Sequence, residues 1–157
     1  MKIAIGADAS GFVVKEAIKE MLIAEGYEVT DVGTLKEEEP VLYTDTACNV
    51  AKLVQSGEAE KGVLCCGTGM GVSIMANKFK GVYAGLVECP YTAEKCAAIN
   101  KCNVLCLGGF LNGNRKACDM VKIWLNTKFA TAGFEAAKEE LEGQLENMKR
   151  IEDINFK

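Results

Sequence analysis

The sequence predicts an α/β domain with a three-layer, Rossmann-like fold around a five-stranded parallel sheet, followed by a C-terminal helical arm. Short β-rich runs alternate along the chain with segments whose apolar residues recur at helical spacing. The run at 62–66 is continuously apolar, as strands are when both faces of a parallel sheet are covered. The length of 157 residues fits one domain. We therefore expect an α/β domain over residues 1–133 and an arm over residues 134–157.

The strands and helices should alternate in strict order. The acidic stretch 34–45 contains Pro40 and shows no periodicity, so we expect an exposed loop there. Right-handed crossovers would place helices on both faces of the sheet, and a ligand site would lie beyond the carboxyl ends of the strands. Strands are expected at 2–6, 28–32, 62–66, 82–87 and 103–107, and helices at about 13–22, 46–55, after the glycine-rich turn that follows residue 66, at 92–99 and around 117–125.

The C-terminal segment carries a narrow apolar stripe between many charged residues. The stripe consists of Leu141, Leu145, Met148 and Ile151. The segment could pack on its own subunit, but the narrowness of the stripe favours an arm that packs on a partner subunit.

Composition excludes several classes of function. The net charge of −4, with scattered lysines and arginines, argues against a nucleic-acid-binding surface. No apolar run approaches the ~20 residues needed to cross a bilayer, and no secretory signal is present, so we expect a cytoplasmic protein that does not bind membranes. The eight cysteines lie mostly in apolar surroundings and are expected to be reduced thiols, and no metal is expected because ligand spacings are missing.

The chain contains no histidine. Histidine is the side chain that ordinarily titrates near neutral pH. Any acid–base chemistry must therefore use Cys, Asp, Glu, Lys, Tyr, hydroxyls or water.

The most informative stretch follows the run at 62–66 and reads Cys65-Cys66-Gly67-Thr68-Gly69-Met70-Gly71. Its glycines let the backbone approach a ligand closely, and successive N–H groups in such a turn bind negative charge, either a phosphate or a developing oxyanion. The dinucleotide fingerprint fails because position 72 is Val, and the lysine of a nucleotide phosphate loop is missing.

Cys66 opens this turn, beside amides whose field should favour a thiolate. Cysteine is often a small core hydrophobe, and Cys66 could be one like Cys65. Its place at the end of the strand favours the mouth of a site instead.

Over nearly its whole length the chain resembles the family of ribose-5-phosphate isomerase type B and the galactose-6-phosphate isomerase subunits. The residues that carry the resemblance include Met1-Lys2-Ile3-Ala4-Ile5-Gly6-Ala7-Asp8, Gly11-Phe12, Asp31-Val32-Gly33-Thr34, Tyr43, Asp45, Cys66-Gly67-Thr68-Gly69-Met70-Gly71, Ala76-Asn77-Lys78, Asn100 and Asn103-Val104-Leu105-Cys106-Leu107-Gly108.

The resemblance implies an aldose–ketose isomerase of the pentose-phosphate type that needs no cofactor. Cys66 would remove the C2 proton, and the amides of Gly67, Gly69, Met70 and Gly71 would stabilise the enediolate. Thr68 would pass protons between the oxygens. Asp8 would lie near the ring oxygen, and Tyr43 and Asn100 would contact sugar hydroxyls. The chain would assemble as a homodimer or a dimer of dimers.

The chain also departs from the family pattern. Ala9, Ile99, Phe110, Gly133 and Ala137 stand where the family usually has His or Arg. Three interpretations stay open: a sugar phosphate held differently, by Lys138, Arg115 or the turn near Ser10 and Gly11; a sugar that is not phosphorylated or is acidic; or a non-catalytic sugar-binding subunit of a hetero-oligomer. The retained Cys66 and Asp8 argue for chemistry.

Overall fold

The computed structural model describes residues 1–131 and 138–156, which form a five-stranded, all-parallel sheet in the order β2-β1-β3-β5-β4. The expected α/β fold with a parallel sheet is confirmed. The strands are β1 (Lys2–Ala7), β2 (Glu28–Asp31), β3 (Lys61–Cys66), β4 (Ala84–Leu86) and β5 (Val104–Gly108).

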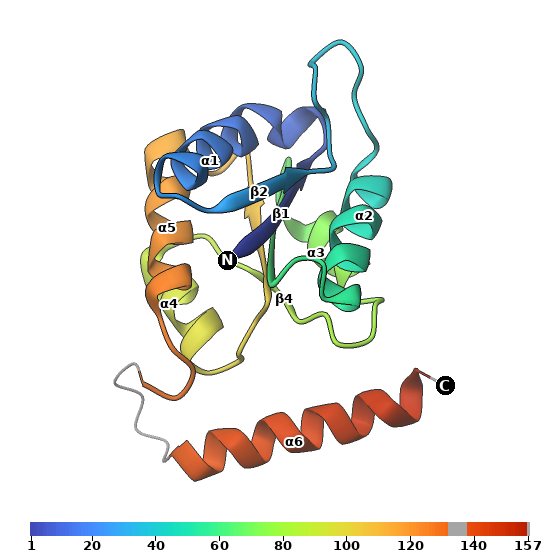
Figure 1. The fold of residues 1–157 in the computed structure, drawn as a ribbon, viewed down its shortest axis with the longest axis vertical. Coiled ribbons are helices and arrows are strands. Elements are labelled where there is room, and N and C mark those ends of the chain that lie inside the picture. Colours follow the sequence, from blue (N-terminus) through green and yellow to red (C-terminus); the bar gives the residue numbers. More distant parts are fainter. Residues whose placement is uncertain (132–137, 157) are drawn as a thin grey trace.

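Helices cover both faces of the sheet (Figure 1). One face carries α1 (Phe12–Ala24), α4 (Pro90–Ala98) and α5 (Asn114–Asn126), and the other carries α2 (Tyr43–Ser56) and α3 (Met70–Ala76). A single 3-10 turn, η1 (Ala9–Gly11), connects β1 to α1. Among the described residues no helix is both long and apolar enough to cross a membrane.

The side chains of β3 alternate between the two layers of the core. Val63 and Cys65 pack with α1, α4 and α5, whereas Leu64 and Cys66 pack with α2 and α3. Because strand residues point alternately to opposite faces, the two adjacent cysteines enter different environments. All the residues from Gly62 to Cys66 are buried, which explains the continuous apolar run in the sequence.

Some boundaries differ from the sequence-based expectation. Helix α2 begins at Tyr43 rather than at residue 46, and β4 is shorter than the run 82–87. The loop after β2 is only partly exposed, because Thr34 is fully buried and hydrogen-bonded. The exposed loop expected over 34–45 is therefore wrong at both of its ends.

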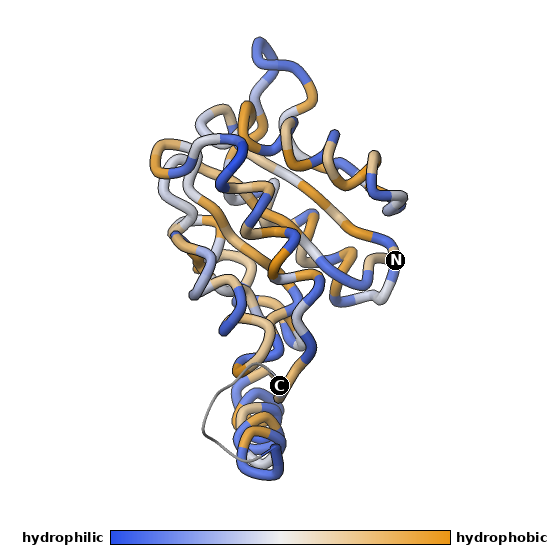
Figure 2. The backbone as a smooth tube through the Cα atoms, turned by 90° about the vertical axis from the view of Figure 1, so that its left-hand side faces the viewer, coloured by the Kyte–Doolittle hydropathy of each residue, from blue (hydrophilic) through white to orange (hydrophobic). Residues whose placement is uncertain are grey.

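Helix α6 (Lys138–Asn155) lies at one edge of the molecule, beyond the sheet (Figures 1 and 2). Within its own chain it contacts the segment before β4: Glu152 accepts hydrogen bonds from the Gly81 amide at 2.6 Å and the Tyr83 hydroxyl at 2.9 Å. Of the predicted stripe only Leu141 is fully buried, while Met148 and Ile151 are exposed. Packing of this arm on a partner subunit stays a prediction. The departures noted at 133 and 137 lie outside the described residues.

Candidate active site at the carboxyl edge of the sheet

The strand order places the topological switch point of the sheet at the end of β3, where a ligand crevice is expected. Strand β3 lies between β1 and β5 in the sheet. The helices that follow β1 and β5 cover one face of the sheet, whereas the helix that follows β3 covers the other face. In open α/β sheets the chain separates at such a point, and ligands bind outside the carboxyl ends of the strands. The elements that meet there are the turn after β1, the glycine-rich turn after β3 and the loop after β5.

Cys66 is the last residue of β3, and its sulfur is directed to the glycine-rich turn. The Gly69 amide donates a hydrogen bond to Cys66 Sγ at 3.1 Å. The side chain is 6% exposed and packs against the α2 and α3 layer, so only a small part of its surface reaches solvent. Cys65 lies on the opposite face, where complete burial raises the pKa of its thiol well above the ordinary range. Of the two cysteines, only Cys66 contacts the turn through its sulfur.

The glycine-rich turn is held closely by its neighbours. Gly69 adopts φ +77°, the left-handed conformation that favours glycine. The Gly109 amide donates to Cys66 O at 2.7 Å, and the Phe110 amide donates to Gly67 O at 3.0 Å. These two bonds join the loop after β5 to the turn and fix its backbone.

Two aromatic rings flank the turn. A Cβ atom on Gly67 would come within 2.6 Å of the Phe110 ring, and one on Gly71 within 2.9 Å of the Tyr43 ring. The Phe110 side chain is 74% exposed and that of Tyr43 is 43% exposed, so both rings line the mouth of the crevice. Sequence reasoning noted Phe110 only as a missing arginine and did not anticipate that its ring covers Gly67.

The turn after β1 lies directly beside the end of β3. Asp8 Oδ1 accepts a hydrogen bond from the Gly11 amide at 3.0 Å, and the Asp8 amide donates to Cys65 O at 3.3 Å. A Cβ atom on Gly11 would come within 2.5 Å of the Cys65 carbonyl carbon, so this position requires glycine. Ser10 lies against Gly109 in the same way. Asp8, Ser10 and Gly11 therefore belong to the same edge of the sheet as Cys66.

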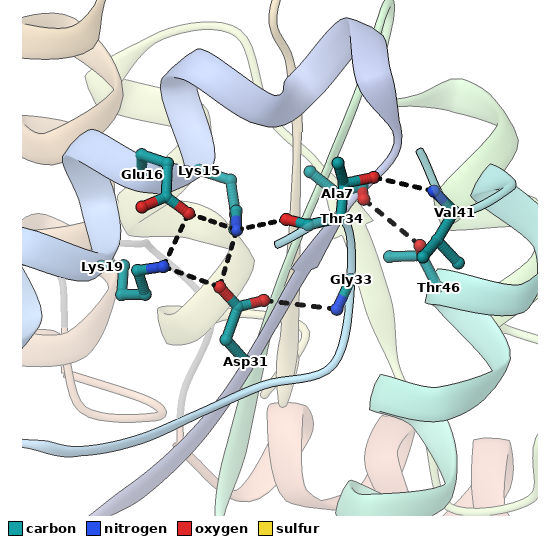
Figure 3. Close-up of polar contacts among 9 residues, drawn as sticks. All are labelled: Ala7, Lys15, Glu16, Lys19, Asp31, Gly33, Thr34, Val41 and Thr46. Atoms are coloured by element: carbon teal, nitrogen blue, oxygen red, sulfur yellow. Dashed lines mark hydrogen bonds and ion pairs between the residues drawn. The ribbon is translucent and has the colours of Figure 1, made fainter. Parts of the chain in front are cut away.

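A polar network that sequence reasoning missed joins α1 to the end of β2 and to the loop that leads to α2 (Figure 3). The ammonium of Lys15 is fully buried and donates to Asp31 Oδ2 at 2.6 Å and to Thr34 O at 2.7 Å. Thr34 Oγ1 in turn accepts from the Val41 amide at 3.0 Å, which closes the loop that leads to Tyr43.

Two further charged side chains complete this network. Lys19 bridges Glu16 and Asp31 at 2.6 and 2.9 Å, and Glu16 also pairs with Lys15. Burial alone would raise the pKa of Glu16, but hydrogen bonds from the two lysines outweigh it and lower that pKa. The signal in the sequence was a lysine beside Val14 on the apolar side of a helix, opposite an aspartate at the end of the next strand.

The structure does not bring Asn100 to this edge within one chain. It follows α4, which runs back from the carboxyl end of β4. Asn103, three residues after Asn100, accepts a hydrogen bond from the Gly62 amide near the start of β3. Cys66 ends this strand four residues after Gly62, which is about 13 Å farther along at the usual rise of a strand. Asn100 lines a cavity with Met148 of α6 instead.

Exposed apolar side chains occur in the elements that form this edge of the sheet, and we call them the apolar rim. Its members are the exposed side chains of Leu42, Tyr43, Met70, Ile74, Phe110 and Leu111, which come from the starts of α2 and α3 and from the loop after β5. Grouped exposed apolar side chains of this kind commonly mark a surface that binds a partner or a ligand. No group of three potential metal ligands (His, Cys, Asp or Glu) occurs among the described residues.

Comparison with known proteins identifies close relatives. A sequence profile of the ribose/galactose isomerase family matches residues 3–141. The chain is 45% identical to a 4-deoxy-4-sulfo-D-erythrose isomerase from Clostridium sp. (strain MSTE9), over 100% of this chain and 99% of that protein. It is 41% identical to ribose-5-phosphate isomerase B from Escherichia coli, over 82% of this chain and 85% of that protein. The solved structure of Clostridium thermocellum ribose-5-phosphate isomerase B matches with a TM-score of 0.89 and 36% identity, covering 99% of both chains.

Proposed function

The chain belongs to the ribose/galactose isomerase family and is an aldose–ketose isomerase, and we propose that its substrate is a four-carbon sugar with a terminal sulfonate, 4-deoxy-4-sulfo-D-erythrose. The observation that carries this proposal is the likeness to the sulfo-sugar isomerase, which extends over the entire chain, including the arm. The retained Cys66 and glycine-rich turn supply the parts that the reaction needs.

The chemistry of the substrate explains why the chain can lack histidine. A four-carbon aldose closes a five-membered ring through its C4 hydroxyl. In the sulfo-sugar, C4 carries sulfur instead of that hydroxyl, so the sugar stays open. No acid is then required to open a ring, which agrees with Ile99 at the position where the family pattern has a ring-opening histidine and with a histidine count of zero. A ribose phosphate would need such a group.

The charge of the substrate accounts for the missing arginines. A phosphate ester carries a charge of about −1.5 to −2 near neutral pH. A sulfonate carries a single negative charge and therefore needs fewer cationic partners. Phe110 covers Gly67 at the mouth of the crevice, where an apolar ring limits the length of the bound sugar. Arg115 and Lys138, the alternative phosphate ligands, are exposed, and Lys138 pairs with Glu142 on its own helix.

In the proposed mechanism Cys66 removes the proton from C2 of the open-chain aldose. The amide that Gly69 directs at Cys66 Sγ stabilises negative charge on the sulfur. The amides of residues 67–71 hold the enediolate oxygens, and Thr68, whose hydroxyl lies 3.4 Å from the Met70 amide, passes the proton between O1 and O2. Return of the proton to C1 gives the ketose. Without a ring oxygen to serve, Asp8 accepts a hydrogen bond from a sugar hydroxyl, with Ser10 and Gly11 beside it.

We propose that the active form is a homodimer in which the apolar rim is covered. The position of Asn100 supports this, because within one chain it lies at the far edge of the sheet and can contact sugar only in the site of a second copy. Light scattering should therefore give twice the monomer mass. A monomer with full activity would contradict the dimer, and a larger multiple would indicate a dimer of dimers.

A second candidate substrate is a sugar phosphate of the ribose 5-phosphate type. The similarity to ribose-5-phosphate isomerase B in sequence and structure favours it. The missing ring-opening histidine and the missing arginines weigh against it. If the chain isomerises some other sugar, or binds a sugar without turnover, none of the substrates tested below should be converted.

The deciding experiment measures isomerisation of 4-deoxy-4-sulfo-D-erythrose, erythrose 4-phosphate and ribose 5-phosphate, with solvent deuterium entering the product as the signature of proton transfer. We expect kcat/KM for the sulfo-sugar to exceed that for ribose 5-phosphate by at least about 100-fold, a difference of ~2.7 kcal/mol in transition-state binding. Cys66→Ala should abolish turnover and exchange. Cys65→Ala, one residue away but on the other face, is the matched control and should retain them. Preference for ribose 5-phosphate would refute the substrate, and an active Cys66→Ala protein would refute the base.

A further inference from the structure

Two cysteines outside the candidate active site meet at the edge strand β4. Cys96 belongs to α4, and Cys102 precedes β5. The Cys102 amide donates a hydrogen bond to Cys96 O at 3.0 Å. Both sulfur atoms lie over Gly85 of β4: a Cβ atom there would collide with Cys96 Sγ and come within 3.2 Å of Cys102 Sγ. Both thiols are free.

This arrangement brings the two thiols close enough to hydrogen-bond to each other. Disulfides join residues whose Cα atoms lie about 4.4–6.8 Å apart and whose Cβ atoms face one another. The main-chain hydrogen bond brings the two backbones together, and Gly85 leaves the space into which both sulfurs point.

The two thiols differ in their tendency to ionise. The hydrogen bond between them raises the pKa of Cys96 and lowers the pKa of Cys102. Burial opposes the shift at Cys102, and the ammonium of Lys61 supports it. Lys61 is held nearby with its Nζ 4.1 Å from the centre of the Trp124 ring. Because the thiolate is the nucleophile in thiol oxidation, Cys102 is suited to react first and Cys96 to react second.

A small oxidant can reach the pair. Cys96 and Cys102 line an open cavity of about 430 Å³ that is bordered by residues of β4, α4 and Met148 of α6. Within one chain the cavity contains neither Cys66 nor the glycine-rich turn, although Asn100, the proposed sugar contact for a second copy, is one of its lining residues. Its polar lining consists of Asn77, Tyr83, Thr92, Lys95 and Asn100.

We propose that Cys96 and Cys102 form an oxidation-sensitive dithiol that a hydroperoxide converts to an intrachain disulfide. The Cys102 thiolate attacks one peroxide oxygen, the O–O bond breaks, and the leaving hydroxide takes a proton to become water, or an alcohol for an organic peroxide. The sulfenic acid formed on Cys102 is then attacked by Cys96 sulfur. The S–S bond forms, the S–O bond breaks, and hydroxide leaves as water with the proton of Cys96. The two thiols lose two electrons, and the peroxide gains them.

The disulfide would close a short ring over residues 96–102. It would tie the end of α4 to the start of β5 and fix the segment that carries Ile99 and Asn100. This segment also faces Leu145 and Met148 of α6. The proposal concerns the thiols alone and does not depend on which sugar the enzyme uses.

The test exposes the reduced full-length protein to equimolar hydrogen peroxide, blocks the remaining thiols and maps tryptic peptides. Cleavage after Lys95, Lys101 and Arg115 places the two cysteines in the separate peptides 96–101 and 102–115. We expect these peptides to be joined, the free-thiol count to fall by two, and dithiothreitol to reverse both changes. Cys106 lies in the second peptide, so Cys106→Ala, which should leave the link intact, shows which sulfur is bridged.

Matched variants separate this pair from the other thiols. Cys89→Ser removes a more exposed thiol and should leave the link unchanged, whereas Cys102→Ser and, separately, Cys96→Ala should each abolish it. The proposal is overturned if the peptides stay separate while other cysteines oxidise, or if the link persists in the Cys102→Ser protein. Circular dichroism shows whether each variant is folded. If only one of Cys102→Ser and Cys96→Ala folds, that variant alone is enough to test the link.

Discussion

Replacing Lys15 with methionine, a side chain of similar length, removes a buried charge from the network that holds the loop before α2. The ammonium of Lys15 is fully buried and contacts Asp31, Glu16 and the carbonyl of Thr34. Methionine keeps most of the apolar stem that packs in the core but leaves the Thr34 carbonyl without its charged donor. The Asp31 carboxylate, which is 10% exposed, keeps only Lys19 as a cationic partner.

Removing one partner of a buried ion pair typically costs about 3–5 kcal/mol. Because Lys19 still lies 2.9 Å from Asp31, we expect a value near the lower end, about 3 kcal/mol. For a chain of this length that corresponds to a fall of about 6–12 °C in Tm. Lys19→Met is the control. Its ammonium is partly exposed and shares its partners with Lys15, so its loss should cost about 1 kcal/mol or less.

Urea unfolding at one fixed protein concentration gives the free energies of unfolding, because the stability of an oligomer depends on concentration. Asp31→Asn keeps an acceptor for the Gly33 amide but removes the carboxylate charge. Combined with Lys15→Met it should recover about 1–2 kcal/mol relative to additive losses. A Lys15→Met protein within 1 kcal/mol of wild type, at unchanged m, would refute the assignment of Lys15 as an anchor of the loop.

Three further perturbations test other parts of the molecule. Burial and the hydrogen bond to Glu152 raise the pKa of Tyr83 from 10.0 to about 12, so its contribution to stability is present below pH 10 and is lost as the pH rises toward 12. Tyr83→Phe should remove this part of the alkaline pH dependence of the free energy of unfolding. The same pH dependence in wild type and Tyr83→Phe would contradict it. A hydrogen bond from Thr92 lowers the pKa of the half-buried Cys89 thiol, so iodoacetamide should label Cys89 at a lower pH than an ordinary thiol. Thr92→Val should shift the labelling profile to higher pH, and identical profiles would exclude this cause. Phe110→Ala should open the mouth of the crevice and improve kcat/KM for five-carbon relative to four-carbon sugars by roughly 10-fold, about 1.4 kcal/mol, and an unchanged ratio would remove Phe110 as a determinant of length.

Much of the fold followed from local pattern. Strand β3 is buried on both faces, so its residues form a continuous apolar run. Helices α1 and α5 are buried on one face, so their apolar residues recur at helical spacing. Both patterns can be recognised in the sequence. The start of α2 was less readable, because Leu42 begins the helix without a side-chain hydrogen bond to the first turn. Its position depends on the loop that Thr34 closes, a contact between residues seven apart.

The candidate site divides in the same way. The turn of residues 66–71 was predictable because its glycines and its place after a buried strand are local features. The position of Asn100 at the opposite edge was also available from the sequence, since a residue between a helix and the next parallel strand returns to the amino edge. The resemblance to known isomerases placed Asn100 beside the sugar without that geometric step. Under the proposed homodimer, a second copy of the chain would supply Asn100 to the site.

The sequence by itself determined the parallel sheet, the absence of histidine chemistry and the cysteine–glycine turn at the end of β3, because periodicity, composition and adjacent residues express them. The tertiary structure decided what surrounds that turn. The ring of Phe110 reaches Gly67 from the end of another strand, and Lys15 reaches Thr34 from another layer. Cys96 and Cys102 meet over Gly85 for the same reason. Such contacts depend on how helices and strands pack in three dimensions, which spacing along the chain does not encode.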